Sequence, residues 1–195
     1  GRQYFLRSGS DQKCLAETGE IIDSAFDKIA KSDTDAVMII GDVTNDGEKI
    51  SHIEFKEKLE NLAKHKPVYI ITSTHDWCCD ENPRRFQGDI VTHNVETMKS
   101  MIFDMQGKTF IELYNEKINL IEYITHIGTT SYVIELNEKV RLLALNDDKN
   151  GNDHAGFTEE HFCWIEEQIK KAYEDNCLII GMEHHLLTPH ISPLI

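Results

Sequence analysis

The chain has 195 residues, 40% hydrophobic and 28% charged, which is typical of one globular domain and short for two. The formal net charge of −14 argues against a nucleic-acid-binding surface, because such surfaces need Lys and Arg to replace counterions. A small phosphorylated substrate is still compatible with this charge if a metal ion supplies local positive charge. No apolar run is long enough to form a membrane segment.

The five cysteines are odd in number, and none lies in a Cys-x-x-Cys arrangement. Cys78 and Cys79 are adjacent, so a disulfide between them would be strained. Cys14, Cys163 and Cys177 lie in or beside apolar patterns, which predicts buried free thiols. Free thiols are typical of a reducing compartment, so we expect a cytoplasmic protein.

The first 15 residues show no period and predict a loop. An amphipathic helix follows, with apolar residues at helical spacing: Ile22, Ala25, Phe26, Ile29 and Ala30. Residues 36–42 form an apolar run that predicts a strand buried on both faces. This strand delivers Asp42 to its carboxyl end, where open α/β sheets bind ligands.

A second helix is predicted to begin at a capping box formed by Ser51 and Glu54. Its apolar positions are Phe55, Leu59, Leu62 and Ala63. Pro67 ends this helix, and residues 68–72 predict another buried strand. A strand–helix–strand unit of this kind predicts a parallel pair with a right-handed crossover. Both strands should therefore bring their carboxyl ends to the same edge.

The composition of residues 78–94 predicts a loop, and a helical pattern continues to residue 105. Three strands follow, at residues 118–123, 132–136 and 140–145, the last two joined by a tight turn at Asn137 and Glu138.

Beyond the loop at residues 146–156, Thr158 is predicted to cap a helix. Its expected core stripe is Phe162, Ile165, Ile169 and Ala172. The last predicted buried strand covers residues 177–182.

Ionisable side chains follow three of the predicted buried strands: Asp42, His75 with Asp76, and His184 with His185. Each has an ordinary alternative, because Asp42 can start a turn, Asp76 can cap one, and His185 can be a packed core residue. Three such positions at the edge of a parallel sheet favour a shared ligand site. Carboxylate and imidazole together suit Mn, Fe or Zn better than Ca.

Four motifs occur in order along the chain: Gly41-Asp42, Gly47-Glu48, His75-Asp76-Trp77 and His184-His185. Together they resemble the calcineurin-like metallophosphoesterase family, over a stretch from residue 22 to the C-terminus. Residues 41–49, followed by Ser51 and His52, are most similar to bacterial members that include cyclic-nucleotide phosphodiesterase-like proteins.

The resemblance implies an α/β fold, a four-layer α-β-β-α sandwich in which residues 1–195 form a single, partial domain. It implies a hydrolase that cleaves phosphodiesters or phosphomonoesters with water activated by two divalent metal ions, Mn, Fe or Zn. Asp42 would bridge the two metals and His184 would bind one of them. His75, held by Asp76, would stabilise the transition state and protonate the leaving oxygen.

Two departures from the family pattern carry consequences. Thr74 stands where the family has an asparagine metal ligand, and its shorter hydroxyl predicts weaker binding of the second metal. The family's first motif, Asp-x-His, and its last, Gly-His-x-His, are not found, and residues 11–13 are the nearest candidate for the first. We therefore expect a domain that is incomplete at both ends, with His126, His154 and His190 assigned to exposed loops.

Two other functional classes are alternatives to a hydrolase. A catalytically impaired binding or scaffolding module of the same family is motivated by Thr74 and by the missing motifs. A flavodoxin-like or nucleotide-binding domain is disfavoured, because no GxGxxG or P-loop pattern follows any strand. The expected partner is a small phosphorylated substrate.

Overall fold

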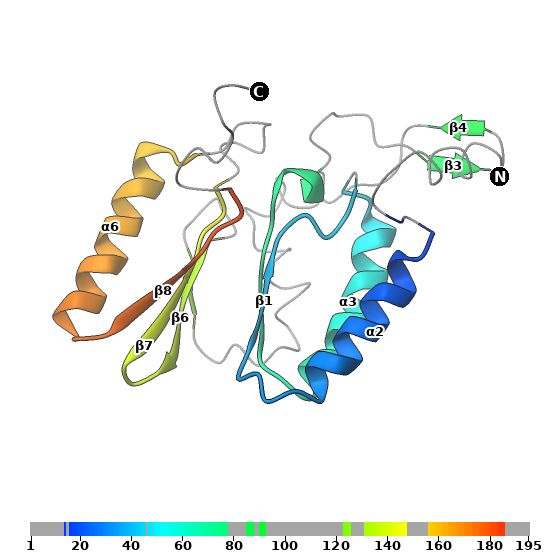
Figure 1. The fold of residues 1–195 in the computed structure, drawn as a ribbon. Helices are drawn as coiled ribbons and strands as arrows, with labels where there is room; N and C mark the ends of the chain where they lie inside the picture. Colours follow the sequence, from blue (N-terminus) through cyan, green and yellow to red (C-terminus); the bar gives the residue numbers. More distant parts are fainter. Residues whose placement is uncertain are drawn as a thin grey trace, which may run out of the picture.

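A computed structural model describes residues 14, 16–45, 47–77, 85–87, 90–92, 123–125, 131–147 and 156–185. Across the structure, helices α2 and α3 are followed by a first sheet, a second sheet and helix α6 (Figure 1). This arrangement confirms an α/β fold with parallel and mixed sheets. The candidate motif at residues 11–13, the helical pattern ending at residue 105, and His126, His154 and His190 lie outside the described residues.

Two helices cover the outer face of the first sheet. Helix α2 (Thr18–Ala30) contributes most of the expected apolar stripe: Ile22, Phe26, Ile29 and Ala30 pack on the core, whereas Ala25, also predicted, is exposed. Helix α3 (Lys49–Ala63) starts before Ser51 and has Glu48 at its N-cap, without a side-chain capping bond. The predicted capping box is therefore wrong, although the apolar face of the helix is confirmed, with His52, Phe55, Leu59 and Leu62 buried.

Strands β1 (Val37–Ile40) and β2 (Val68–Ile71) pair in parallel, which confirms the predicted strand–helix–strand unit. All four residues of β2 are buried. In β1 only Val37 is buried and Ile40 is 45% exposed, so the prediction of burial on both faces is wrong for this strand. Within the described ranges β2 is the only strand paired with β1, which leaves Ile40 uncovered.

The second sheet is mixed, with the order β5 (Tyr123–Thr125), β6 (Tyr132–Asn137), β7 (Val140–Ala144) and β8 (Leu178–Met182). Strands β7 and β8 are parallel, and the other neighbours are antiparallel. The β6–β7 turn lies at Glu138 and Lys139, one residue later than predicted. Among the described strands β8 pairs only with β7, and Leu178 is 64% exposed, so the prediction of a buried strand is wrong.

A separate antiparallel hairpin is formed by β3 (Arg85–Gln87) and β4 (Ile90–Thr92), in a stretch predicted as loop.

The prediction that three of the cysteines are buried is wrong. Cys14 and Cys163 are exposed and Cys177 is half-buried, and all three are free thiols. Of the helices in the described residues, none combines the length and the apolar character needed to cross a membrane.

Helix α6 (Glu159–Glu174) lies on the outer face of the second sheet (Figure 1). Thr158 caps it as predicted, because its side chain accepts the backbone N–H of His161 at 3.2 Å. The predicted core stripe is partly wrong, since Phe162 is 53% and Ile169 is 48% exposed. The buried face is formed by His161, Ile165, Gln168 and Ala172. A pattern of apolar residues cannot predict the burial of the two polar members, His161 and Gln168.

The two sheets pack against each other through a buried cluster of Tyr69, Ile71, Tyr132, Ile134, Leu142, Ala144 and Met182. The hydroxyl of Tyr132 links the sheets by donating to the Ile70 carbonyl at 3.0 Å and accepting the Ile70 N–H at 3.1 Å. The carboxyl ends of β1, β2 and β8 lie at the same end of the molecule (Figure 1). These ends come from two facing sheets, whereas the strand pattern alone suggested one parallel sheet.

Candidate active site

The turn after β1 determines where Asp42 lies. Gly41 and Asp42 both have positive φ values, 69° and 54°, a backbone conformation that glycine adopts freely and aspartate tolerates. A Cβ on Gly41 would lie 2.6 Å from the Cβ of Ser73, so glycine is required for the close approach of the ends of β1 and β2. The Asp42 side chain remains 34% exposed, so an ion or a substrate can reach it.

The carboxylate of Asp76 joins the loops that follow β1 and β2. It is fully buried, and its oxygens accept the backbone N–H groups of Asp42 at 2.9 Å, Ser73 at 3.0 Å and Thr44 at 3.1 Å. Burial raises the pKa of Asp76 to about 7, and the N–H donors act in the opposite direction. Asp76 therefore positions Asp42, and the expectation that it holds the His75 ring needs correction.

His75 lies in a short 3₁₀ helix, η1 (Thr74–Trp77). Its ring Nδ1 is 2.7 Å from the carbonyl oxygen of Asn45, and because a carbonyl can only accept, Nδ1 carries the hydrogen. Asn45 thus orients the ring and leaves Nε2 as its other polar atom. The backbone N–H of His75 donates to Oδ1 of Asp42 at 3.3 Å, which places the two residues side by side.

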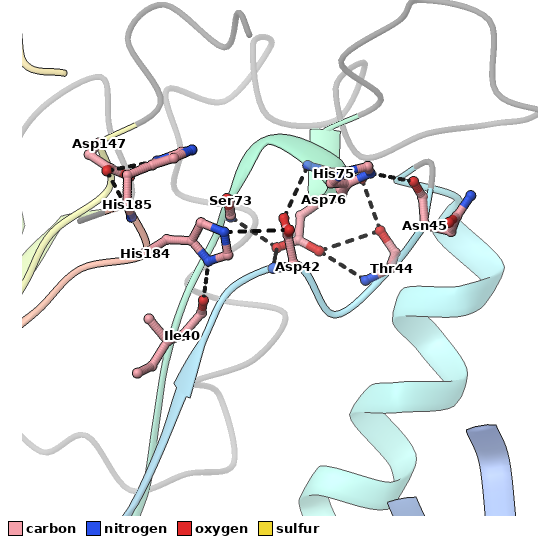
Figure 2. Close-up of polar contacts among 10 residues, drawn as sticks. All are labelled: Ile40, Asp42, Thr44, Asn45, Ser73, His75, Asp76, Asp147, His184 and His185. Carbon is pink, nitrogen blue, oxygen red and sulfur yellow. Dashed lines mark hydrogen bonds and ion pairs between the residues drawn. The ribbon is translucent and has the colours of Figure 1, made fainter. Parts of the chain in front are cut away.

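His184, from the other sheet, completes this group of residues. Its Nδ1–H donates to the carbonyl oxygen of Ile40 at 2.6 Å, and its Nε2 lies 3.4 Å from Oδ2 of Asp42 (Figure 2). Asp42, His75 and His184, which were expected to meet, therefore lie close together. The catalytic and metal-binding roles assigned to them remain predictions.

The contact between Asp42 and His184 fits a shared metal ion. Ligands about 2.0–2.1 Å from a tetrahedral zinc lie about 3.4 Å from each other, as these two atoms do. A metal-binding histidine usually donates its second ring N–H to a carboxylate or a backbone carbonyl, as His184 does to Ile40. The His184 side chain is 25% exposed, so the contact is accessible.

Thr74, the predicted replacement for an asparagine ligand, is half-buried at the first position of η1, directly before His75. Within the described ranges, no group of three or more His, Cys, Asp or Glu residues converges to hold a metal ion. The described residues thus offer the pair Asp42 and His184 for one metal, and Thr74 as the residue predicted to bind a second.

His52 bonds to the backbone of the candidate site. It is fully buried in α3, and its Nε2 lies 3.0 Å from the backbone carbonyl oxygen of Asp76, which accepts its hydrogen. Burial lowers the pKa of His52 to about 4, so the ring is neutral near pH 7. His52 was visible in the sequence only as part of the motif that follows Gly47.

His185 is half-exposed and its ring is bonded to the buried carboxylate of Asp147, so it is not the packed core residue considered as an alternative. Asn45 and Asp147 were not among the predicted site residues. Asn45 acts through its backbone carbonyl, and because every residue has one, the sequence could not identify this position. Asp147 lies in the polar stretch at residues 146–156, for which the sequence predicted no site role, and its contact with His185 is visible only in the fold.

The family model for calcineurin-like phosphoesterases matches residues 13–193 of this chain. A curated relative, the "Probable glycerophosphodiester phosphodiesterase GpdQ" of Arcobacter nitrofigilis, is 25% identical over 162 residues. This match covers 79% of the chain and 46% of the relative, so the chain spans about half the length of the curated relative it matches.

Proposed function

The chain belongs to the calcineurin-like phosphoesterase family, and from that premise we propose that it is a metal-dependent phosphoester hydrolase. The contact between His184 Nε2 and Asp42 Oδ2, at 3.4 Å, is the observation that carries this proposal. We also propose that residues 1–195 form one domain with the four-layer α-β-β-α sandwich that the family implies.

In this proposal, Asp42 and His184 would hold one divalent metal, and Asp42 and Thr74 would hold a second. When bound, the metals would supply positive charge and a water of lowered pKa. His75, fixed by Asn45, would direct its Nε2 at the phosphoryl group and protonate the leaving oxygen. Asp76 keeps Asp42 in place by accepting the backbone N–H of Asp42.

We favour a small phosphodiester as substrate. The matched relative is named for glycerophosphodiesters, and the motif at residues 41–49 resembles that of cyclic-nucleotide phosphodiesterase-like proteins. The formal net charge of −14 disfavours a polyanionic substrate that extends over the surface.

The second candidate is a catalytically impaired member of the family that serves as a binding or scaffolding module. Two observations support it: the hydroxyl of Thr74 at the expected amide position, and the lack of a three-residue ligand group in the described part of the chain. Such a module would bind a metal or a phosphorylated ligand without turnover.

The two candidates are separated by measuring metal content and hydrolysis of bis-nitrophenyl phosphate with Mn, Fe or Zn. The hydrolase requires metal-dependent release of nitrophenol that falls at least about 100-fold in Asp42→Asn and in His184→Ala. Asp175→Asn, a carboxylate change at the C-cap of α6, should leave the rate unchanged. Wild-type protein that binds metal but cleaves neither diesters nor monoesters would favour the module.

A further inference from the structure

A buried carboxylate and a half-exposed imidazole form a pair beside the contact between His184 and Asp42. Asp147 follows β7 and is 1% exposed. Its Oδ2 accepts two bonds from His185, one from the backbone N–H at 3.2 Å and one from the ring Nδ1–H at 2.8 Å. Its Oδ1 has no hydrogen-bond partner among the described residues, so the bonds of this side chain go to His185 alone.

His185 in turn contacts His184. The two ring centroids are 5.0 Å apart and the planes are inclined at 80°, an edge-to-face arrangement. On its other side, the His184 ring is bonded to the Ile40 carbonyl. The β7–β8 pairing ends at Met182, so the ladder no longer fixes the backbone at His184. The orientation of the His184 ring therefore depends on these side-chain contacts.

We infer that Asp147 is a positioning residue for the candidate site. By fixing the backbone and the ring of His185, it holds the His184 ring with Nε2 directed at Asp42 (Figure 2). The inference rests on the proposed function insofar as His184 is a metal ligand there. The orientation itself is a property of the metal-free protein and can be measured without turnover.

The primary measurement is ¹⁵N NMR of the histidine rings in metal-free protein at about pH 8.5, where exposed imidazoles are neutral. Wild-type His184 should show the tautomer with hydrogen on Nδ1, as its bond to Ile40 requires. Asp147→Ala should shift His184 to a mixture of tautomers and lower zinc affinity, measured by chelator competition, about 10-fold or more. Asp175→Ala, which removes an exposed carboxylate bonded to Arg141, should change neither quantity.

The conservative variant Asp147→Asn should restore most of the wild-type behaviour. Its amide oxygen can accept both bonds from His185, while its NH₂ takes the position of the oxygen that has no partner in the described residues. A role in local stability alone would lower the unfolding midpoint of Asp147→Ala without changing the tautomer of His184.

His185→Phe supplies a related test should Asp147→Ala fail to fold, because phenylalanine keeps a ring beside His184 but loses the ring donor to Asp147, while the backbone N–H at 185 still donates. In the His185→Phe background, Asp147→Ala should lower zinc affinity less than it does in the wild type, since the ring bond to Asp147 is already broken there. Losses that multiply, or an unchanged His184 tautomer and zinc affinity within twofold of wild type in the single variants, would overturn the inference. If Asp147→Ala shifts the His184 tautomer but the wild-type protein shows no hydrolysis, the inference stands and the proposed function is refuted.

Discussion

His184 donates its ring Nδ1–H to the carbonyl oxygen of Ile40, two residues before Asp42 in the chain. One side chain of the second sheet is thereby anchored to the strand that delivers Asp42, and its Nε2 is left 3.4 Å from Asp42 Oδ2. The site is thus assembled across two sheets, and its geometry depends on how tightly their ends are held together.

Gly41→Ala should destabilise the protein by about 2 kcal/mol or more, because the new Cβ would clash with Ser73 and φ is 69° at this position. Urea unfolding followed by circular dichroism measures this change. The matched control is Gly181→Ala, since a Cβ there meets nothing within 4 Å and should leave the midpoint nearly unchanged. Equal midpoints for the two variants would contradict the close approach of β1 and β2.

Tyr132→Phe should cost about 2–4 kcal/mol, because it leaves the buried N–H and the buried carbonyl of Ile70 without the hydroxyl that satisfies both. Tyr173→Phe is the control, since Tyr173 is 84% exposed. Thermal unfolding of both variants measures the effect. A Tyr132→Phe protein as stable as wild type would show that this hydroxyl does not hold the sheets together.

The pH dependence of stability should carry a contribution from His52, whose pKa burial lowers from 6.5 to about 4. In this window the unfolded chain binds the extra proton, so the free energy of unfolding rises with pH. The contribution, about 3 kcal/mol, is complete above the unfolded pKa and is lost as the pH falls through the folded one.

His52→Gln is the variant that isolates this effect, because its amide can still donate to the carbonyl of Asp76 but does not titrate. Its stability should change less than that of wild type between pH 4 and pH 6.5. Burial raises the pKa of Asp76 to about 7, which gives an opposite dependence, but this term is common to both proteins and cancels in the difference. Parallel curves for the two proteins would contradict the prediction.

Thr74→Asn should raise the affinity for the more weakly bound metal about tenfold, because a carboxamide reaches farther than a hydroxyl and is a better neutral ligand. Isothermal titration with Mn²⁺ or Zn²⁺ measures this change. Thr74→Val, which has nearly the same shape but no oxygen, should bind no better than wild type. If Thr74→Asn leaves both affinity and turnover unchanged, the impaired binding module is the better description of the chain.

Much of the fold followed from periodicity. Periodicity predicted the stripe of α2, the apolar face of α3 and the parallel pair β1 and β2, because each of them packs a regular set of apolar side chains against the core. The side chains brought together at the site were predictable for a related reason. Asp42, His75 and His184 each follow an apolar strand, and strand ends are where such sheets place their ligands.

The sequence pattern gave wrong predictions where polar side chains are buried or apolar side chains are exposed. Helix α6 turns His161 and Gln168 inward and Phe162 outward, so the apolar stripe identifies only part of the buried face. The hydrogen bonds that orient His75 and His184 are accepted by backbone carbonyls. Every residue has such a carbonyl, so the residue type does not reveal these bonds. The pairing of Asp147 with His185 joins positions 38 residues apart, and only the packing of β7 and β8 brings them together.

The most direct test of the site is anomalous diffraction from crystals of the protein grown with zinc. We expect an anomalous peak about 2.0–2.2 Å from both Oδ2 of Asp42 and Nε2 of His184. That peak should disappear in Asp42→Asn crystals grown in the same way. Zinc bound elsewhere, or no peak at these two atoms at millimolar zinc, would contradict the claim that they share a metal ion.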